Sequence, residues 1–497
     1  MNETQMTEAK RLAATGRYHV MPVTEEMLSD LYTPVGVLRT LQYVSSHSFI
    51  LESAEGEKTW GRYSFLGFEP KLEFCCKDGI CRTRELCPTG EGRVSIQTSC
   101  PERLIRELIA KYRSPRIEGL PPFTGGLVGY FSYDYIRYAK TGLDIEAVDD
   151  ANFNDVDLML FDQVIAFDHL KQKIILMVGM SLDGDIDKDY EHAKIRLERL
   201  KGLVRGRREK HPETLKLLTP PQALFTREEY CEMVCEAKRY IYEGDIFQVV
   251  LANRIFARKE GSIFDVYRLL RSSNPSPYMF YLSGDDIELA GASPETLVKL
   301  KEGILHTFPL AGTRKRGETR KEDEKLMQEL LLDEKELAEH NMLVDLGRND
   351  LGKISKVGTV CLEKYQSIER FSHVMHLGST VKGEIAEDKD FMDAIGAVLP
   401  ARTLSGAPKI RACEIIDKLE GHRRGIYGGA VGYIDFTGNL DMCIAIRMAY
   451  AKKDELYVCS GAGIVAESVP ENEYQECLNK AMAVMEAVED AGKEMDV

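Results

Sequence analysis

The pattern of hydrophobic and polar positions divides the chain into two unequal parts. Residues 24 to about 200 alternate short apolar runs, rich in β-branched and aromatic residues, with turn residues, which predicts strands. The charged stretch 189–210 then predicts a helix. Residues 206–222 are polar and contain a Pro-Pro pair, so we interpret them as a linker between an N-terminal region, 20–205, and a second region, 223–490.

The second region mixes helices, strands and glycine-rich turns. Thr226 is followed three residues later by Glu229, the spacing of a capping box that opens a helix. Apolar positions from Leu330 to Leu346 keep a helical spacing and predict a further helix that ends at Gly347. Because the elements lack the regular βαβ rhythm of a parallel sheet, we expect an α+β layered fold.

Composition and charge limit the classes of function. With 44% hydrophobic and 29% charged residues over 497 positions, the chain can form a large core. It has no apolar run of the roughly 18 residues that a membrane helix needs, and the first twenty residues lack a signal-peptide core, so we expect a cytosolic protein without a membrane partner. The net charge of −15 argues against nucleic acid as a partner. Twelve cysteines without a CxxC pair favour reduced structural thiols over a metal site.

Two pairs of glutamates stand out among the charged residues. Glu473 and Glu476 share one face of a predicted helix with Lys480, and Glu336 and Glu339 repeat the spacing on another helix. The ordinary interpretation of each is a solvated helix face with an i, i+4 ion pair. If the two helices face each other, however, four carboxylates need a cation, and Mg²⁺ suits a site with oxygen ligands and open positions.

Two glycine-containing segments are candidates for binding anions. Gly312 and Thr313 lie in a predicted turn beside three basic residues, and Gly461, Ala462 and Gly463 form a predicted turn after the strand 456–459. Backbone N–H groups exposed in such turns bind carboxylate or phosphate. Neither segment has a nucleotide-binding spacing, and glycine turns between strands are usually only turns.

Arg447 is a third candidate for binding an anion. It lies in the alternating stretch 444–450, which predicts a strand with Arg447 on the face opposite its apolar neighbours. A guanidinium group there can bind a carboxylate through two hydrogen bonds, and a structural ion pair is at least as common.

Several motifs occur in one order over nearly the whole chain, among them "PLAGTRKRG", "AEHNMLVDLGRNDLGKI", "PARTLSGAPKIRA" and "GAGIVAESVPENEYQECLNKA". In these motifs the sequence resembles the anthranilate synthase component I family of chorismate-utilising enzymes. The resemblance implies a layered sandwich of antiparallel sheets flanked by helices. It also implies a lyase that converts chorismate and ammonia to anthranilate and pyruvate, with Mg²⁺ as cofactor.

The resemblance also implies roles for single residues. Glu339 and Glu476 would be Mg²⁺ ligands, with Glu336 and Glu473 as direct or water-mediated partners, and Lys480 would reach a substrate carboxylate.

Glu295 would be the general acid that protonates the ring hydroxyl as it leaves, and His376 would assist proton transfer or positioning. The residues implied to hold the two substrate carboxylates are Gly312, Thr313, Tyr427, Arg447, Gly461, Ala462 and Gly463.

Two positions separate anthranilate formation from the other activities in the superfamily. Enzymes that make aminodeoxychorismate carry a nucleophilic lysine where this chain has Ala311, and enzymes that add water to chorismate carry a basic lysine where it has Gln248. A glutamine has no basic lone pair to deprotonate water, whereas ammonia is already basic. Both departures favour anthranilate, with aminodeoxychorismate synthase as the alternative enzyme and a non-catalytic sensor of chorismate or tryptophan as the alternative of another class.

Partners and regulation follow from the same resemblance. The chain has no glutaminase motif, so ammonia would come from solution or from a glutamine amidotransferase subunit, component II, in a heterotetramer. Tryptophan would act as a feedback inhibitor bound near Ser53, Pro277, Tyr278 and Met279. Without the resemblance, these residues would be read as the end of a strand and a proline-rich turn.

Overall fold

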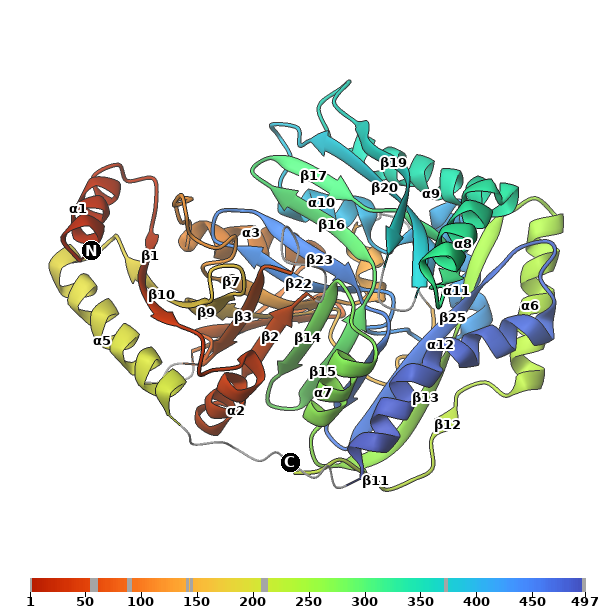
Figure 1. The fold of residues 1–497 in the computed structure, drawn as a ribbon, viewed down its shortest axis with the longest axis horizontal. Coiled ribbons are helices and arrows are strands. Elements are labelled where there is room, and N and C mark those ends of the chain that lie inside the picture. The colour runs from red at the N-terminus through yellow and green to blue at the C-terminus, as the bar shows by residue number, and fades with distance from the viewer. Residues whose placement is uncertain are drawn as a thin grey trace.

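The computed structural model describes residues 2–53, 61–86, 92–139, 143, 146–206, 213–370 and 374–493. Within them the chain forms two antiparallel sheets, a larger one of 13 strands and a smaller one of 12, with helices around both (Figure 1). The expected α+β sandwich of antiparallel sheets is confirmed.

The larger sheet joins strands from both parts of the chain. Its order is β1 (Val20–Leu28), β10 (Lys173–Ser181), β9 (Gln163–Asp168), β3 (Tyr63–Phe68), β2 (Ser48–Glu52), β14 (Tyr278–Ser283), β15 (Ile287–Ser293), β24 (Met448–Lys452), β25 (Glu455–Ile464), β13 (Gln248–Glu260) and β11 (Lys216–Leu217), with β12 (Gln222–Ala223) and β21 (Gly406–Ala407) also paired to β13. The two parts meet where β2 pairs with β14, with Leu51 opposite Phe280.

The smaller sheet is shared in the same way. Its order is β18 (Leu310–Lys315), β20 (Val374–Glu384), β17 (Ile304–Thr307), β16 (Thr296–Lys301), β23 (Leu440–Ile444), β22 (Ala430–Asp435), β7 (Gly126–Phe131), β8 (Val156–Phe161), β4 (Leu72–Lys77), β5 (Ile80–Glu85) and β6 (Arg93–Gln97), with β19 (Cys361–Arg370) paired to β20. Here the two parts meet where β7 pairs with β22, with Phe131 opposite Ala430.

Helices cover the sheets and connect their strands. They are α1 (Asn2–Ala13), α2 (Pro34–Val44), α3 (Pro101–Lys111), α4 (Ile136–Ala139), α5 (Ile186–Arg205), α6 (Arg227–Tyr242), α7 (Phe264–Ser273), α8 (Arg320–Leu332), α9 (Glu334–Gly352), α10 (Phe391–Val398), α11 (Lys409–Glu420) and α12 (Pro470–Ala491), with short 3₁₀ turns at Tyr133–Tyr135 and Arg402–Leu404. In the described part of the chain, no helix is long and apolar enough to cross a membrane.

The main core lies between the two sheets, where Phe49 and Phe65 from the larger sheet meet Phe74 and Leu127 from the smaller one. A second apolar layer forms where α2, α5, α7 and α12 pack on the outer face of the larger sheet. The sheets therefore bury both faces over much of their area, which is why strands such as β8 and β9 are apolar without alternation.

Helix ends follow local sequence signals where these involve capping. Thr226 and Glu229 form the expected capping box at the start of α6, which confirms that prediction.

The predicted end at Gly347 is wrong, since α9 continues to Gly352. The helix predicted from Leu330 onward is instead interrupted at Asp333, between α8 and α9. The Asp333 carboxylate accepts hydrogen bonds from backbone N–H groups in the first turn of α9. Interior packing of Gly347 against Thr307 and its neighbours explains why glycine does not end the helix there.

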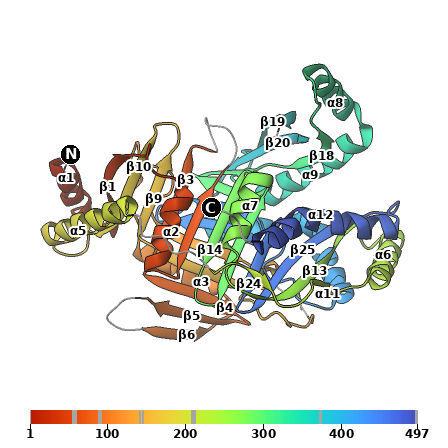
Figure 2. The same cartoon turned by 60° about the horizontal axis from the view of Figure 1, so that its bottom comes forward.

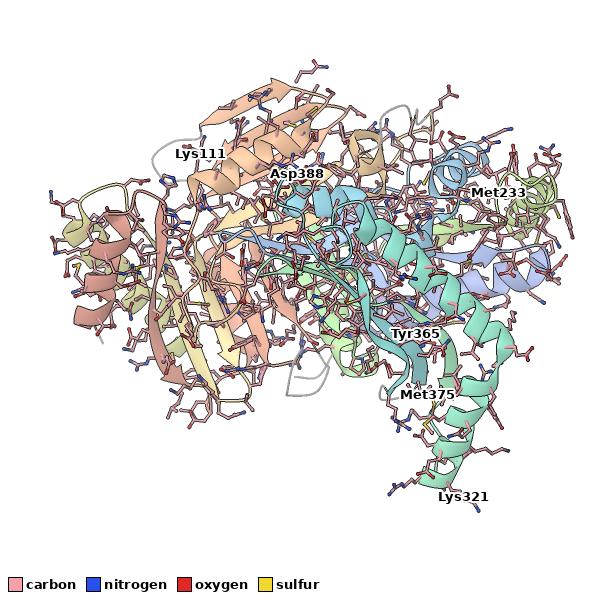
Figure 3. The ribbon with its side chains drawn as sticks, turned by 90° about the horizontal axis from the view of Figure 1, so that it is seen from above. Lys111, Met233, Lys321, Tyr365, Met375 and Asp388 are labelled. Atoms are coloured by element: carbon pink, nitrogen blue, oxygen red, sulfur yellow. The ribbon has the colours of Figure 1, made fainter. Side chains whose placement is uncertain are left out.

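The two predicted regions do not correspond to two separate sheets. Residues 20–205 supply five of the 13 strands of the larger sheet and five of the 12 strands of the smaller one, and the later part of the chain supplies the rest. The boundaries 20–205 and 223–490 stay a prediction. Of the predicted linker 206–222, residues 207–212 lie outside the described part, whereas β11 and β12 pair with β13. The α8 helix projects from the body of the molecule, with Lys321 near its far end (Figures 2 and 3).

Candidate active site

The two acidic helices, α9 and α12, bring their glutamates close to one another. Burial raises the pKa of Glu339, and the negative charges of Glu336 and Glu476 raise it further. Burial likewise raises the pKa of Glu473, and Glu476 adds to the effect. The four carboxylates therefore form one electrostatic group drawn from two helices, which the sequence pattern alone left open.

Lys480 connects this acidic group to a strand of the larger sheet. Its ammonium lies 2.6 Å from Oε1 of Glu476 and donates a hydrogen bond of 3.1 Å to the carbonyl of Gly461. The lysine thus lies between the predicted metal ligands and the predicted substrate-binding strand.

The donor set of the acidic group fits a hard divalent cation. It consists of carboxylate oxygens, which Mg²⁺ prefers, and their mutual repulsion is the kind that a bound cation relieves. Glu336, Glu339, Glu473 and Glu476 are the residues that would hold the ion.

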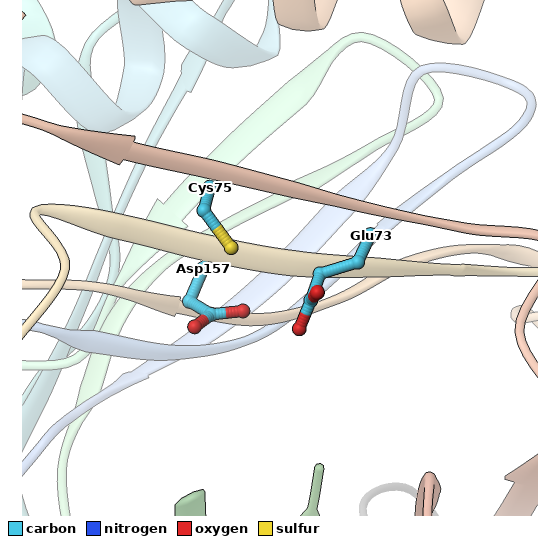
Figure 4. A group of neighbouring side chains, drawn as sticks. All are labelled: Glu73, Cys75 and Asp157. Atoms are coloured by element: carbon cyan, nitrogen blue, oxygen red, sulfur yellow. The ribbon is translucent and has the colours of Figure 1, made fainter. Parts of the chain in front are cut away.

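A more compact group of potential ligands lies elsewhere, on the smaller sheet. Among the described residues, Glu73, Cys75 and Asp157 are the one set of three whose ligand atoms lie within 4.8 Å of one another (Figure 4). Arg84 already pairs with Glu73 at 2.8 Å, and burial raises the pKa of Asp157 to about 7 and that of the Cys75 thiol well above its usual value. Protons and an arginine thus neutralise this group, in keeping with a structural role.

Glu295 lies between β15 and β16, next to a small cavity. Burial raises the pKa of its carboxyl to about 7, and the Thr403 hydroxyl, which donates to Oε1 at 3.1 Å, lowers it. Its backbone carbonyl accepts from the N–H of Ile444 at 3.0 Å, which fixes the main chain of Glu295 relative to β23. A buried carboxyl that holds a proton near neutral pH has the property required of a general acid.

His376 lies on β20 and contacts the segment that carries Gly312 and Thr313. Its Nδ1 is 3.0 Å from the Gly312 carbonyl and 3.1 Å from the Thr313 hydroxyl. Because a carbonyl can only accept, Nδ1 carries a proton, and burial lowers the pKa of the ring. The neutral imidazole therefore has its basic lone pair on Nε2.

The predicted turn at Gly312 and Thr313 is instead a strand with a bulge. Both residues belong to β18, whose pairing with β20 shifts register between Ala311 and Thr313. Gly312 takes a φ of 62° at the bulge, a conformation that favours glycine. The irregular backbone that the sequence analysis placed in a turn is therefore produced within a sheet.

The predicted turn at Gly461, Ala462 and Gly463 is also part of a strand, β25, which pairs with β13 throughout this stretch. Glycine is required at position 461, because a Cβ there would lie 2.7 Å from the backbone carbonyl oxygen of Leu251. A Cβ on Gly461 would lie 3.2 Å from the Tyr427 hydroxyl, and one on Gly463 would lie 3.0 Å from Nε2 of Gln248. Tyr427 and Gln248 thus both border this strand.

Arg447 is not in an alternating strand, as the pattern predicted, but in the connection between β23 and β24, with a φ of 53°. Its Nη1 donates to the carbonyl of Lys480 at 3.1 Å, and burial lowers the pKa of the guanidinium group. Among the described residues no carboxylate pairs with it within 4.0 Å, so the alternative of a structural ion pair is not supported there. A partly buried arginine of this kind favours an anionic ligand.

Thr403 is a site residue that the sequence analysis did not single out. It lies in the 3₁₀ turn Arg402–Leu404 and is the hydrogen-bond donor to Glu295. The motif "PARTLSGAPKIRA" contains it, but nothing in the spacing of that motif indicates which side chain faces the acid.

The four residues predicted to bind an inhibitor line one cavity of about 510 Å³, away from the acidic helices. Ser53 and the run Pro277, Tyr278 and Met279 come from opposite sides of the β2–β14 pairing. Strands of both sheets contribute to the walls, since Tyr433 and Asp441 of the smaller sheet line it as well.

A short chain of hydrogen bonds joins this cavity to the candidate acid. Thr296, the residue after Glu295, donates from its hydroxyl to that of Tyr278 at 3.0 Å. Tyr278 in turn donates to Asp441 at 2.7 Å. A ligand that moves Tyr278 would therefore disturb the strand end that carries Glu295.

Comparisons with known proteins agree with this geometry. A family model for chorismate binding enzymes matches residues 48–486. Anthranilate synthase component 1 of Acetivibrio thermocellus is 45% identical over 485 residues, covering 96% of this chain and 97% of the relative. The protein of the same name from Aquifex aeolicus is 43% identical over 491 residues, covering 97% of both chains.

Solved structures give the same result. Anthranilate synthase component I from Streptococcus pneumoniae superposes with a TM-score of 0.74 at 35% identity, covering 93% of this chain and 99% of that one. The menaquinone-specific isochorismate synthase of Escherichia coli has a TM-score of 0.68 at 19% identity, covering 98% and 100%, and shows the fold alone. The chain therefore belongs to the anthranilate synthase component I family of chorismate-utilising enzymes.

Proposed function

We propose that this chain is the large subunit of anthranilate synthase and converts chorismate and ammonia to anthranilate and pyruvate. The observation that carries the proposal is Glu295, a buried carboxyl with a pKa of about 7 that accepts a hydrogen bond from Thr403 and whose backbone carbonyl accepts from Ile444, three residues before Arg447. Membership in the family supports the same activity, because relatives that match nearly the whole chain are named for it.

The proposed reaction has two steps. Ammonia attacks C2 of the chorismate ring while both ring double bonds shift and the C4 hydroxyl leaves, Glu295 supplies the proton that turns this hydroxyl into water, and the nitrogen at C2 loses one proton to become an amine. In the second step the C2 proton is removed, the enolpyruvyl group leaves and takes up a proton to become pyruvate, and the ring becomes aromatic. His376, neutral and basic at Nε2, is suited to accept a proton near the ring.

Cations on this chain would hold the dianionic substrate. Arg447 is partly buried, and Lys480 lies beside Gly461 of the strand β25. When bound at Glu339 and Glu476, with Glu336 and Glu473 close by, Mg²⁺ would neutralise and orient the ring carboxylate. Fixing both carboxylates places C2 and C4 relative to the acid before reaction.

The choice of ammonia as nucleophile rests on Gln248 and Ala311. Gln248 borders Gly463, and no base is present at that position to activate water. Ala311 is buried in β18, where an amine would be needed for a covalent adduct. Aminodeoxychorismate formation is the alternative, and it differs in that pyruvate is retained.

The proposed activity is tested by giving purified protein chorismate, an ammonium salt and Mg²⁺ and recording anthranilate fluorescence. We expect a steady rise that EDTA abolishes and excess Mg²⁺ restores. Mass analysis of the products distinguishes anthranilate plus pyruvate from aminodeoxychorismate. Folded protein that leaves chorismate unchanged under these conditions, with and without an amidotransferase subunit, would overturn the proposal.

We further propose that ammonia comes in the cell from glutamine through component II in a heterotetramer, that the enzyme acts in the cytosol, and that tryptophan inhibits it. Inhibition is supported by the 510 Å³ cavity that gathers Ser53, Pro277, Tyr278 and Met279. The hydrogen bond from Thr296 to Tyr278 gives an inhibitor in this cavity a route to Glu295.

Ser53→Phe is expected to raise the tryptophan concentration needed for half-inhibition by at least about tenfold while kcat without tryptophan stays within about twofold, because the added ring fills the cavity and not the active site. Inhibition curves at fixed chorismate measure the effect. Ser272→Phe, at an exposed position outside the cavity, is the matched control and should be inhibited like the wild type. Identical inhibition curves for the wild type and Ser53→Phe would show that tryptophan does not bind in this cavity.

A further inference from the structure

The turn that carries Thr403 is held from the side by Asp350, a residue to which the family resemblance assigns no role here. The Asp350 carboxylate accepts from Nε of Arg402 at 3.2 Å and from its Nη2 at 3.1 Å. Lys409 donates to the same carboxylate at 3.1 Å and to the carbonyl of Val398 at 2.8 Å. One carboxylate on α9 thus fixes residues on both sides of the turn.

This ion cluster is buried and directional. Asp350 is 5% exposed and Lys409 is 6% exposed, so water contributes little to either group. A forked pair between a guanidinium group and a carboxylate fixes orientation as well as distance, which a single point contact does not. The cluster is therefore suited to setting the position of the backbone at Arg402.

Arg402 is the direct neighbour of Thr403, whose hydroxyl reaches Glu295. Asp350, Arg402, Thr403 and Glu295 line the same cavity, of about 60 Å³, so no other layer of residues separates the ion cluster from the acid. The main-chain path from the guanidinium group to the Thr403 hydroxyl is one residue long. A shift of Arg402 would therefore change the geometry of the 3.1 Å hydrogen bond from Thr403 to Glu295.

We propose that Asp350 is a positioning residue for the reaction: through Arg402 it holds the Thr403 hydroxyl in hydrogen-bonding position at the carboxyl group of Glu295. The inference rests on the proposed function, in which Glu295 is the acid. Helix α9 would then have two roles. It carries Glu336 and Glu339, and through Asp350 it holds the residue that donates to Glu295.

The direction of the effect follows from the hydrogen bond. A hydroxyl that donates to a carboxylate stabilises the ionised form and lowers the pKa of Glu295 against the effect of burial. Loss of the bond makes the acid hold its proton to higher pH and release it less readily. The other charged groups lining the cavity, Asp350 and Arg402, neutralise each other and stay paired if only the geometry of the pair is changed.

The test is a double-mutant cycle of Arg402→Lys and Thr403→Val. Arg402→Lys keeps the charge that Asp350 needs and loses the forked geometry. Each single variant should lower kcat about tenfold with KM changed less than about twofold, and should move the alkaline limb of the kcat profile up by about half a pH unit. The double variant should show no more than the effect of Thr403→Val alone, because both changes remove one interaction. Thr403→Ser, which keeps the hydroxyl, should restore most of kcat.

Lys353→Met is the matched control, since it removes a cation that also contacts Oδ1 of Asp350, at 3.1 Å, but is about half exposed, and it leaves both hydrogen bonds from Arg402 to Asp350 in place. It should keep the wild-type kcat and pH profile. If Arg402→Lys does not accumulate as folded protein, Asp350→Glu, which keeps the charge and lengthens the side chain, should give the same shift. A wild-type profile in the folded variant, or effects that add in the double variant, would overturn the proposal. A wild-type enzyme that forms no anthranilate would instead overturn the proposed function.

Discussion

Glu295→Gln is expected to lower kcat for anthranilate formation by about 1,000-fold, within the range of roughly 10² to 10⁴ that general acid catalysis contributes. Glutamine keeps the shape of the side chain and can still accept from Thr403, but it has no proton of suitable acidity for the leaving hydroxyl. KM for chorismate should change little, because the residues expected to bind its carboxylates are untouched. Initial rates of anthranilate fluorescence at saturating chorismate measure the loss.

The pH profile gives an independent check on the same residue. Burial raises the pKa of Glu295 to about 7, so the protonated, active form dominates below this pH and is lost above it. We therefore expect kcat of the wild type to fall as pH rises through about 7, and the residual rate of Glu295→Gln to lack that limb. Glu260→Gln, at an exposed strand end, should behave as wild type. A Glu295→Gln variant that keeps more than about a tenth of kcat would exclude Glu295 as the acid.

Glu476→Ala is expected to lower activity at a physiological Mg²⁺ concentration by more than about 100-fold. Mutation of residues that only support metal ligands already lowers metal affinity or activity roughly 10- to 100-fold. A second readout does not depend on activity. Mg²⁺ should raise the Tm of the wild type, because an ion that binds only the folded state stabilises it, and this rise should be lost in Glu476→Ala. Thermal unfolding with increasing MgCl₂ measures it.

Glu486→Ala is the matched control for the metal site, because Glu486 is an exposed glutamate on the same helix, α12, and lies outside the group that contains Glu339 and Glu473. It should retain both the activity and the Mg²⁺-dependent rise in Tm. An equal rise in Tm for Glu476→Ala and the wild type would place the metal elsewhere, and Ca²⁺ in place of Mg²⁺ would show whether the site selects between the two ions.

The sequence predicted the fold class better than the backbone conformation of single residues. The capping box at Thr226 needs only local hydrogen bonds and is confirmed, whereas Gly347 continues a helix because tertiary packing decides how glycine is used there. Gly312 and Gly461 both suggested turns. In the structure they lie in strands, because a bulge and a close approach between strands use the same freedom of glycine that a turn uses.

Sequence patterns could not predict contacts between segments that are far apart along the chain. Periodicity places Glu336 and Glu473 on helix faces but cannot show that the two helices approach each other, and that approach is set by the packing of α9 and α12 on different sheets. The bond from Thr403 to Glu295 spans 108 residues and has no local signal. Arg447 was expected in a strand because its neighbours alternate, although the chain there changes from the smaller sheet to the larger one.

The division of both sheets between the two parts of the chain has a consequence for cutting the protein. A chain cleaved between α5 and β11 would give two fragments, each with two newly exposed strand edges, at β2 and β7 in one and at β14 and β22 in the other. Open edges of this kind pair with any matching strand. The fragments should therefore be poorly soluble when produced alone, yet reassemble when produced together, so that strand complementation, rather than the docking of two finished domains, rebuilds the enzyme.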